Sequence, residues 1–242
     1  MIRALHVPGP GLTLAEVARD TGMTRAAARR FLLTLSDLGY VRCADRRFSL
    51  TPRVLELGYS FLSGLTLPEI AQPHLRELVE QVHESSSVCV LDRTEIVFVA
   101  REPTRWRIMT VSIAVGMRFP AYATSMGRVL LAGLDDPRLD QFFETAELTT
   151  LTLGTVTDPD LLRAEIARVR KQGWALVDQE LELGLRSLAS PIRDPRGEVV
   201  AAVNVSTHAS RRTLEAPRRE LLPPLRETAA RISHDLAALQ RP

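Results

Sequence analysis

Apolar positions in the first fifty residues follow a helical period and then alternate. Thr13 and Glu16 have the spacing of a capping box at the start of one helix, and Gly22 suits its end. Thr24 begins a second predicted helix, whose apolar stripe consists of Ala28, Phe31, Leu32, Leu35 and Leu38. Two alternating segments, 40–43 and 47–50, then predict a hairpin around residues 44–46. Helix, turn, helix and hairpin in this order predict a winged helix-turn-helix.

Polar and basic residues lie on the second helix away from its apolar stripe. A helix that enters a DNA major groove needs such a face, because Arg reaches base edges and phosphates. The hairpin tip is also basic, which suits a wing lying on the DNA backbone. The alternative is a solvated basic face with no partner. The candidate DNA contacts are Thr24, Arg25, Ala26, Arg29, Arg30, Arg46 and Arg47.

Charge is distributed unevenly, although the 242 residues carry a net charge of only +2. Residues 1–62 contain nine arginines against five acidic residues, a net charge of +4, so the remaining residues carry −2. A basic head on a faintly acidic body favours a polyanionic partner for the head alone.

Beyond residue 51, helical and strand-like segments alternate irregularly. Thr51-Pro52 opens a helix, and an interruption at residues 63–68 marks a domain boundary before a longer helix through Val82. We predict strands at 87–91, 96–100, 108–111, 187–192 and 199–206, where Val, Ile and small residues are frequent. We predict helices at 125–134, 137–144, 159–172 and 217–239. This mixed order indicates an α+β sheet domain.

Enzymatic, metal and membrane chemistry finds no support in the sequence. GxSxG, HExxH and Walker motifs do not occur, and the five histidines lack metal-ligand spacing. We expect these histidines on helix surfaces and loop edges, and we expect neither catalysis nor a cofactor. Cys43 and Cys89 are typical of a reducing cytoplasm, and Cys89 is predicted to be a core residue. No apolar run reaches about 18 residues, so we expect no membrane span and a cytoplasmic protein.

Long segments of head and body resemble the IclR family of bacterial transcriptional regulators. The head segment is GLTLAEVARDTGMTRAAARRFLLTLSDLGYV, followed by FSLTPRVLELG. The body segments are FPAYATSMGRVLLAGL (119–134), DQELELGLRSLASPIRD (178–194) and GEVVAAVNVS (197–206). One longer segment, RIMTVSIAVGMRFPAYATSMGRVLLA, is similar to the family branch that regulates the β-ketoadipate pathway, the protocatechuate and 4-hydroxybenzoate regulators.

The resemblance implies a fold in three parts. These are a winged helix-turn-helix DNA-binding domain at 1–51, a linker helix at 52–67 and a GAF-like antiparallel-sheet effector-binding domain at 68–242. It also implies a homodimer or dimer of dimers on double-stranded operator DNA. The implied function is an effector-responsive regulator of aromatic acid catabolism, whose effector is a small organic acid.

One departure from the family leaves an alternative open. The family normally has a full helix before the first predicted one, and residues 1–5 resemble only its tail, so the chain start is expected to be short or truncated. The alternative function is a GAF-like small-molecule-binding protein whose head does not read DNA. This short start is its only support.

The resemblance also implies a ligand pocket. The positions of this chain that match the family's pocket include small polar residues at strand ends and at a helix start. Their hydroxyl, amide and N–H groups suit a carboxylate or a phenol, and Asn204 and Ser206 share one strand face. The alternative is that they only satisfy buried backbone groups. The candidate effector contacts are Val111, Phe119, Ser125, Met126, Asp178, Glu180, Leu185, Ser187, Asn204 and Ser206.

An arginine is a further candidate, because guanidinium groups bind carboxylates with two parallel hydrogen bonds. Arg105, Arg107 and Arg118 precede the 119–134 segment and are candidates for this role, whereas Arg186 alternates out of phase with Leu185 and Ser187. Asp178 and Glu180 are candidate acceptors for a phenolic hydroxyl group.

Overall fold

The computed structural model describes residues 1–5, 11–57, 66–104, 113–211 and 215–239. The chain divides into two compact units, Met1–Gly64 and Leu65–Pro242. The division after residue 64 lies within the interruption at residues 63–68. The helix predicted over 52–67 is described only in part: a short 3-10 helix and residues 55–57 are helical, and 58–65 lie outside the described residues.

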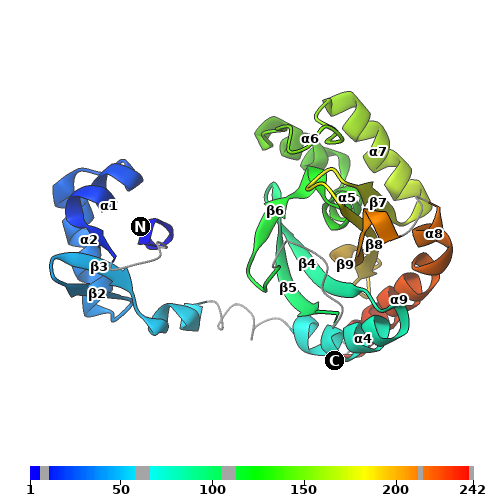
Figure 1. Ribbon diagram of the computed structural model, residues 1–242, viewed down its shortest axis with the longest axis horizontal. Coiled ribbons are helices and arrows are strands. Elements are labelled where there is room, and N and C mark those ends of the chain that lie inside the picture. The colour runs from blue at the N-terminus through cyan, green and yellow to red at the C-terminus, as the bar shows by residue number, and fades with distance from the viewer. Residues whose placement is uncertain (6–10, 58–65, 105–112, 212–214, 240–242) are drawn as a thin grey trace. The chain divides into compact units, whose positions relative to one another are not determined.

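The smaller unit combines short helices with a three-stranded antiparallel sheet (Figure 1). Its strands lie in the order β1-β3-β2. The elements in chain order are η1 (Ile2–Leu5), β1 (Leu12–Thr13), α1 (Leu14–Thr21), α2 (Arg25–Asp37), β2 (Val41–Ala44), β3 (Arg47–Leu50) and η2 (Pro52–Val54). The predicted helix, turn, helix and hairpin are therefore confirmed.

Local chemistry fixes the ends of these elements. The Thr13 hydroxyl accepts from the Glu16 amide at 3.4 Å, and the Glu16 carboxylate accepts from the Thr13 amide at 2.7 Å, which confirms the capping box. Gly22 ends α1 at φ 65°, and Thr24 caps α2. In the hairpin turn, Asp45 and Arg46 both have positive φ, the conformation that a tight two-residue turn requires.

The core of the smaller unit is small. Its buried cluster consists of Leu5, Val17, Leu32, Val41 and Phe48. Each such side chain stabilises the fold by roughly 1.5–3 kcal/mol. The predicted stripe of α2 is only partly buried, since Phe31 and Leu38 are 46% and 51% exposed. The prediction fails for these two residues because the described part of the unit covers α2 only on the side of Ala28 and Leu32.

The larger unit is a six-stranded antiparallel sheet with helices on both faces (Figure 1). The strand order is β6-β5-β4-β9-β8-β7, formed by β4 (Ser85–Asp92), β5 (Glu95–Glu102), β6 (Arg118–Pro120), β7 (Ala175–Asp178), β8 (Leu185–Arg193) and β9 (Val199–His208). Helices α4 (Thr66–Val82) and α9 (Leu222–Leu239) pack together on one face. The other face is covered by η3 (Ala121–Ala123), α5 (Ser125–Ala132), α6 (Asp136–Thr145) and α7 (Pro159–Gln172).

Most predicted elements of this unit are confirmed, with three differences. The strand predicted at 108–111 lies outside the described residues. Strands β6 and β7 were not predicted, because three or four residues are too few to display an alternating pattern. The helix predicted at 217–239 is two helices, α8 (Ala216–Glu220) and α9, after the short η4 (Ala209–Arg211). Pro223 and Pro224 explain the break, because proline lacks the N–H that a helix interior uses.

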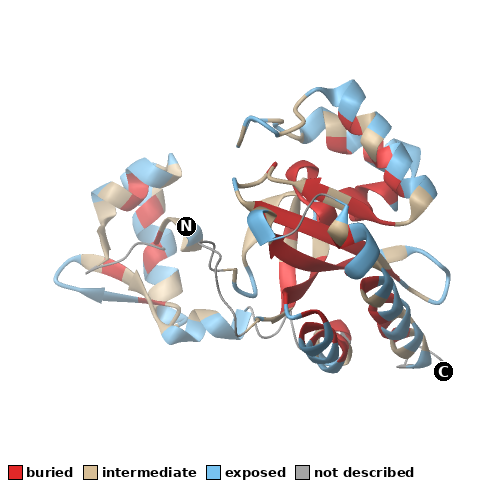
Figure 2. Ribbon diagram, turned by 45° about the vertical axis from the view of Figure 1, so that its right-hand side comes forward, coloured by how far each residue is buried: buried red, intermediate tan, exposed pale blue. Residues whose placement is uncertain are grey.

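Buried residues lie in the strands and on the inner helix faces (Figure 2). Cys89 is completely buried as predicted, and burial raises the pKa of its thiol well above the ordinary value. The prediction that every histidine lies at the surface is wrong for His74, which is 8% exposed. His74 faces α9 from α4 and is hydrogen-bonded to Asp235 at 2.7 Å, so a helix interface accommodates its polar ring.

None of the described helices has both the length and the apolar character to cross a bilayer. Within the same residues, no group of three His, Cys, Asp or Glu side chains is placed to hold a metal ion.

Candidate effector pocket and DNA-binding surface

A pocket in the larger unit lies where the sheet meets the start of α5. Seven of the ten candidate effector residues line it: Phe119, Ser125, Met126, Leu185, Ser187, Asn204 and Ser206. Of the other three, Val111 lies outside the described residues, and Asp178 and Glu180 do not line the pocket. Residues up to 87 positions apart in sequence, Phe119 and Ser206, are thus brought to one place by the sheet.

Hydroxyl and amide groups form one connected network at the polar end of the pocket. The Asn204 side chain donates to Ser187 Oγ at 3.0 Å and to Ser206 Oγ at 2.9 Å, and it accepts from the Ser87 amide at 3.0 Å. Ser125 Oγ donates to Ser187 Oγ at 2.8 Å. Strand register explains the cluster, because Ser187 lies opposite Ser206 and Ser87 lies opposite Asn204. All of these groups are neutral.

The start of α5 adds backbone donors to this end. Thr124 caps the helix by accepting from the Gly127 amide at 3.0 Å, which leaves the first-turn N–H groups near the pocket-lining Ser125 and Met126. Gly127 is required here, because a Cβ at this position would overlap the backbone of Ala121. The helix start can therefore lie close against the segment before it.

Apolar side chains line the rest of the pocket. The rings of Phe98 and Phe119 meet edge to face, with centroids 5.8 Å apart and planes at 87°. Half of the lining residues were not predicted from the sequence: Ile96, Phe98, Ile113, Ala123, Thr124, Val177 and Leu181. Alternation along 96–100 places Ile96 and Phe98 on one strand face, so the pattern contained a signal for these two.

The two carboxylates predicted to contact effector are occupied by arginines instead. Asp178 Oδ1 accepts from Arg186 Nε at 2.8 Å, and Glu180 Oε2 accepts from Arg128 Nη2 at 2.6 Å. Both arginines are more than 90% buried, so each needs a carboxylate partner where it lies. This requirement explains why neither carboxylate is directed into the pocket.

Arg118, one of the three arginines predicted to bind an effector carboxylate, does not line the pocket either. Arg118 pairs with Asp92 at 2.6 Å and with Glu95 at 2.7 Å. Desolvation lowers the pKa of Arg118, but the hydrogen bonds to these two carboxylates outweigh it, so the pKa is raised overall. Arg105 and Arg107 lie outside the described residues. The described lining residues of the pocket therefore include no charged side chain.

The pocket has little free space. Its free volume is about 30 Å³, which is room for little more than one water molecule. A larger cleft of about 570 Å³ lies between the end of α5, α7 and the β8–β9 hairpin. Two arginines of that cleft are engaged locally, since Arg170 donates to the Ala132 and Leu134 carbonyls and Arg193 donates to that of Gly197.

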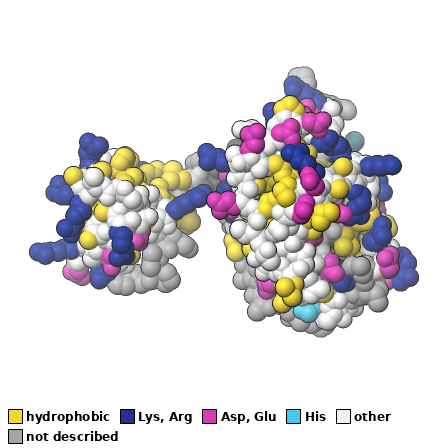
Figure 3. Space-filling view, turned by 90° about the horizontal axis from the view of Figure 1, so that it is seen from above, with side chains coloured by type: hydrophobic (Ala, Val, Ile, Leu, Met, Phe, Trp, Pro, Cys, Tyr) yellow, Lys and Arg dark blue, Asp and Glu magenta, His cyan; other side chains and the backbone are white. Residues whose placement is uncertain are grey.

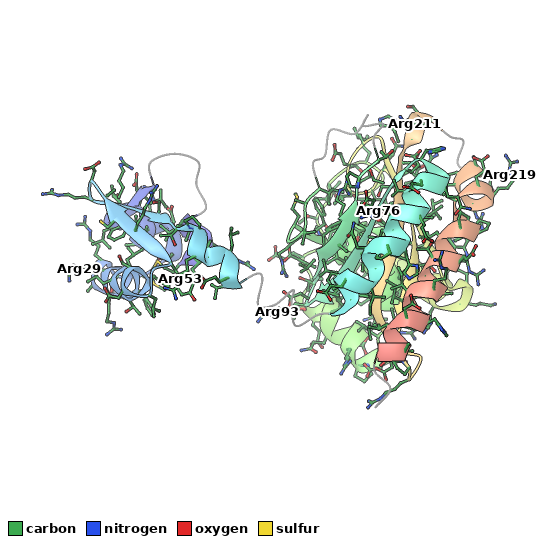
Figure 4. The ribbon with its side chains drawn as sticks, turned by 90° about the horizontal axis from the view of Figure 1, so that it is seen from below. Arg29, Arg53, Arg76, Arg93, Arg211 and Arg219 are labelled. Carbon is green, nitrogen blue, oxygen red and sulfur yellow. The ribbon has the colours of Figure 1, made fainter. Side chains whose placement is uncertain are left out.

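Exposed arginines characterise the second candidate site, on the smaller unit (Figure 3). Thr24, Arg25, Ala26, Arg29 and Arg30 are all exposed at the start of α2, and Arg29 projects from the unit (Figure 4). The three arginines of this set form no ion pair with any described residue. An exposed row of unpaired guanidinium groups on one helix can bind phosphates and base edges.

The two hairpin arginines differ from each other. Arg46 is exposed at the turn between β2 and β3. Arg47 is half-buried, donates to the Gly11 carbonyl at 3.0 Å and lies 3.8 Å from the Glu16 carboxylate. Arg47 therefore has a structural role in holding β1 and α1 near the hairpin, which sequence spacing did not indicate.

A helix-turn-helix unit and a sheet unit with a small pocket, joined in one chain, define a ligand-responsive transcription regulator. Comparison with family models supports this class in both units. The IclR helix-turn-helix domain matches residues 2–43, and the bacterial transcriptional regulator IclR C-terminal domain matches residues 59–234. The chain belongs to the IclR family of bacterial transcriptional regulators, as the sequence resemblance predicted.

Known relatives span nearly the whole chain. The Pca regulon regulatory protein of Pseudomonas putida is 45% identical over 236 residues, which are 98% of this chain and 81% of the relative. A crystal structure of a regulator from Rhodococcus sp. RHA1 has 57% identity and a TM-score of 0.84, covering 99% of this chain and 96% of that one. The inducer-binding domain of a PobR double mutant from Acinetobacter, solved with 3-hydroxybenzoic acid, has 34% identity and a TM-score of 0.65, covering 70% of this chain and 98% of that one.

Proposed function

We propose that this protein regulates genes of aromatic acid catabolism by binding operator DNA with its smaller unit and an aromatic acid, or a ring-cleavage product, in the pocket of its larger unit. The relative from Pseudomonas putida is a regulator of the pca regulon, and the PobR inducer-binding domain was solved with a hydroxybenzoic acid. Both relationships support the β-ketoadipate pathway as the regulated chemistry.

The observation that carries this proposal is the division of the pocket into an apolar and a polar end. Phe98 and Phe119 offer a surface for a flat ring. The start of α5 offers backbone N–H donors for a carboxylate or phenolate, and the side chains of Asn204, Ser187 and Ser206, hydrogen-bonded to one another, form the neutral polar surface beside it. Because these donors are neutral, the pocket suits a small monoanion held by several hydrogen bonds.

The proposed DNA-bound form is a homodimer or dimer of dimers on a palindromic operator. Two copies of α2 would then enter successive major grooves, about one helical turn apart. Arg25, Arg29, Arg30 and Arg46 are the proposed contacts to phosphates and bases. The helix-turn-helix match over residues 2–43 favours this function over a head that does not read DNA. A regulator of this kind acts in the cytoplasm, where the chromosome lies.

Effector and operator are proposed to act on each other through the separation of the two recognition helices. An effector that prefers one arrangement of the dimer changes operator affinity, and by linkage the operator changes effector affinity equally. This reciprocity makes both binding reactions useful tests of the same mechanism.

Calorimetric titration of the full chain tests the proposal. The panel consists of protocatechuate, 4-hydroxybenzoate, catechol, β-ketoadipate, glyoxylate and pyruvate. Saturable binding of one aromatic acid or of β-ketoadipate is the expected result. Binding of glyoxylate or pyruvate alone would contradict a role in aromatic acid catabolism but not the family assignment. Absence of binding by all six compounds would contradict the proposed effector class.

A further inference from the structure

A buried ion pair links two walls of the pocket. Arg128, on α5, donates from Nη2 to Oε2 of Glu180 at 2.6 Å, and their side chains are 3% and 9% exposed. Arg128 Nε also donates to the Tyr122 carbonyl at 3.0 Å, and Glu180 Oε2 also accepts from the Val156 amide at 3.0 Å. The pair thus joins α5 and the segment before it to the β7–β8 turn, residues 179–184, and to the loop around residue 156.

The two charged residues do not line the pocket, but their neighbours do. Ser125 and Met126 line it from the first turn of α5, and Leu181 lines it from the β7–β8 turn, directly after Glu180. Desolvation of two charges is costly, and an apolar pair of similar size would fill the same space. Unlike an apolar pair, the ion pair is directional, and it fixes the position of the β7–β8 turn relative to α5.

The β7–β8 turn is held mainly by polar contacts. Leu183 is 73% exposed and Leu181 is only half-buried, so the turn buries little apolar surface. Thr152 Oγ1 donates to the Gln179 carbonyl at 2.6 Å. Gln179 and Gly184 both have positive φ, at 57° and 83°, so each end of the turn is a point where the chain changes direction.

A wall of the pocket must move when an aromatic ring enters. The free volume is about 30 Å³, whereas a cavity that accepts benzene measures roughly 150 Å³. Strand β9 is central in the sheet, and every residue of α5 is buried. The β7–β8 turn buries less apolar surface than these two walls, because Leu183 is 73% exposed and Leu181 is half-buried.

We propose that Arg128 and Glu180 are positioning residues that hold the β7–β8 turn closed over the pocket and so set the residence time of the effector without touching it. This inference rests on the proposed function for the identity of the ligand. Its structural part, that the ion pair keeps the turn closed, stands independently and is testable without ligand.

Hydrogen exchange of the ligand-free protein tests the structural part. Arg128→Met is expected to speed amide exchange at Val156 and in the β7–β8 turn about tenfold, because the turn opens more often. Arg186→Met is the matched control, because it removes an arginine of similar burial that pairs with Asp178 in the same hairpin. The control is expected to leave Val156 unchanged. Equal acceleration in both variants, or none in Arg128→Met, would overturn the inference.

Effector kinetics test the functional part by stopped-flow dissociation of the acid identified by titration. Arg128→Met is expected to raise the dissociation rate about tenfold, and Arg128→Lys to restore part of the loss because the charge remains. The double variant Arg128→Met, Glu180→Leu replaces the ion pair with apolar side chains and leaves no unpaired charge buried. It is the variant to use if the single variant does not fold.

A double-mutant cycle then decides whether the two residues act through each other. The double variant is expected to dissociate no faster than Arg128→Met alone, since one link is lost in either case. Additive effects, or acceleration by Arg186→Met of the same size, would overturn the positioning role. If the wild-type protein binds none of the six acids, the proposed function fails, and hydrogen exchange alone decides the role of the pair.

Discussion

Arginines lie in opposite environments in the two units. On the smaller unit, Arg25, Arg29 and Arg30 are exposed and form no ion pair with a described residue. On the larger unit, the arginines nearest the pocket are paired, Arg128 with Glu180 and Arg186 with Asp178, and the polar groups of the pocket are neutral. A DNA backbone brings a high density of charge to a wet surface, so free arginines are effective there. Inside a closed pocket an unpaired arginine would suffer a large desolvation penalty, and neutral donors avoid it.

The comparison predicts, as its largest effect, that salt separates the two binding reactions. If a dimer contacts about six phosphates, raising salt from about 50 to about 200 mM is expected to weaken operator binding about a thousandfold. Effector binding by neutral donors in the closed pocket is expected to change less than about twofold over the same range. Fluorescence anisotropy for DNA and calorimetry for effector measure the two slopes. Equal salt dependence of operator binding and effector binding would contradict the conclusion that DNA is bound by charged groups and effector by neutral ones.

The next largest effect is expected from the exposed helix face. Arg29→Ala is expected to weaken operator binding about tenfold at fixed salt, because a lost base or phosphate contact of this kind typically costs about 1–3 kcal/mol. Arg76→Ala, an exposed arginine on α4, is the matched control and is expected to leave operator affinity unchanged. Unchanged affinity and salt slope in Arg29→Ala would remove α2 as the recognition helix.

A smaller effect is expected in the pocket. Asn204→Ala is expected to weaken effector binding about fivefold, because the hydrogen bonds that hold the Ser187 and Ser206 hydroxyls at the polar end of the pocket are lost, and one neutral hydrogen bond contributes about 1 kcal/mol. Thr207→Ala is the control, since Thr207 on the same strand donates instead to Glu84 at 2.7 Å. Calorimetry measures both variants. An equal loss in both would mean that the change reports on strand packing and not on a ligand contact.

The smallest effect concerns stability and pH in the smaller unit. Hydrogen bonds from the backbone and side chain of Thr13 lower the pKa of Glu16 below its ordinary value of 4.5. The resulting stability is therefore present above that value and is lost as pH falls through the lowered pKa. The melting temperature of the wild type is expected to be slightly higher than that of Glu16→Gln near pH 6. The two melting temperatures are expected to coincide at about pH 3. A difference that grew toward acid pH would contradict the capping assignment.

Local signals explain what the sequence could predict. Thr13, Gly22 and Thr24 mark helix ends through contacts within a few residues, and they were located correctly. The helix at 159–172 was predicted to the residue, because Asp158, Pro159 and Gly173 mark both of its ends. Such chemistry depends on neighbours in the chain, so a single sequence contains it.

Contacts between distant segments explain what it could not. Glu180 was expected to meet ligand, but Arg128 binds it from 52 residues away. Likewise Arg47 was expected at DNA, but it donates to the Gly11 carbonyl 36 residues earlier. Residue type and spacing identified Glu180 and Arg47 as functional candidates. They do not reveal a protein partner that is distant in sequence. In the pocket, six positions came from the family resemblance and Phe119 was predicted as a wall residue, whereas the rest of the apolar wall depended on sheet register.

The most direct test of the account is operator affinity measured with and without the aromatic acid. Full-length protein is titrated against a fragment from immediately upstream of its own coding sequence, at one salt concentration, with the acid absent and then saturating. The account predicts that the acid shifts the dissociation constant about fivefold or more, the usual size of an allosteric coupling. Superimposable curves in the presence of an acid that calorimetry shows to be bound would contradict it.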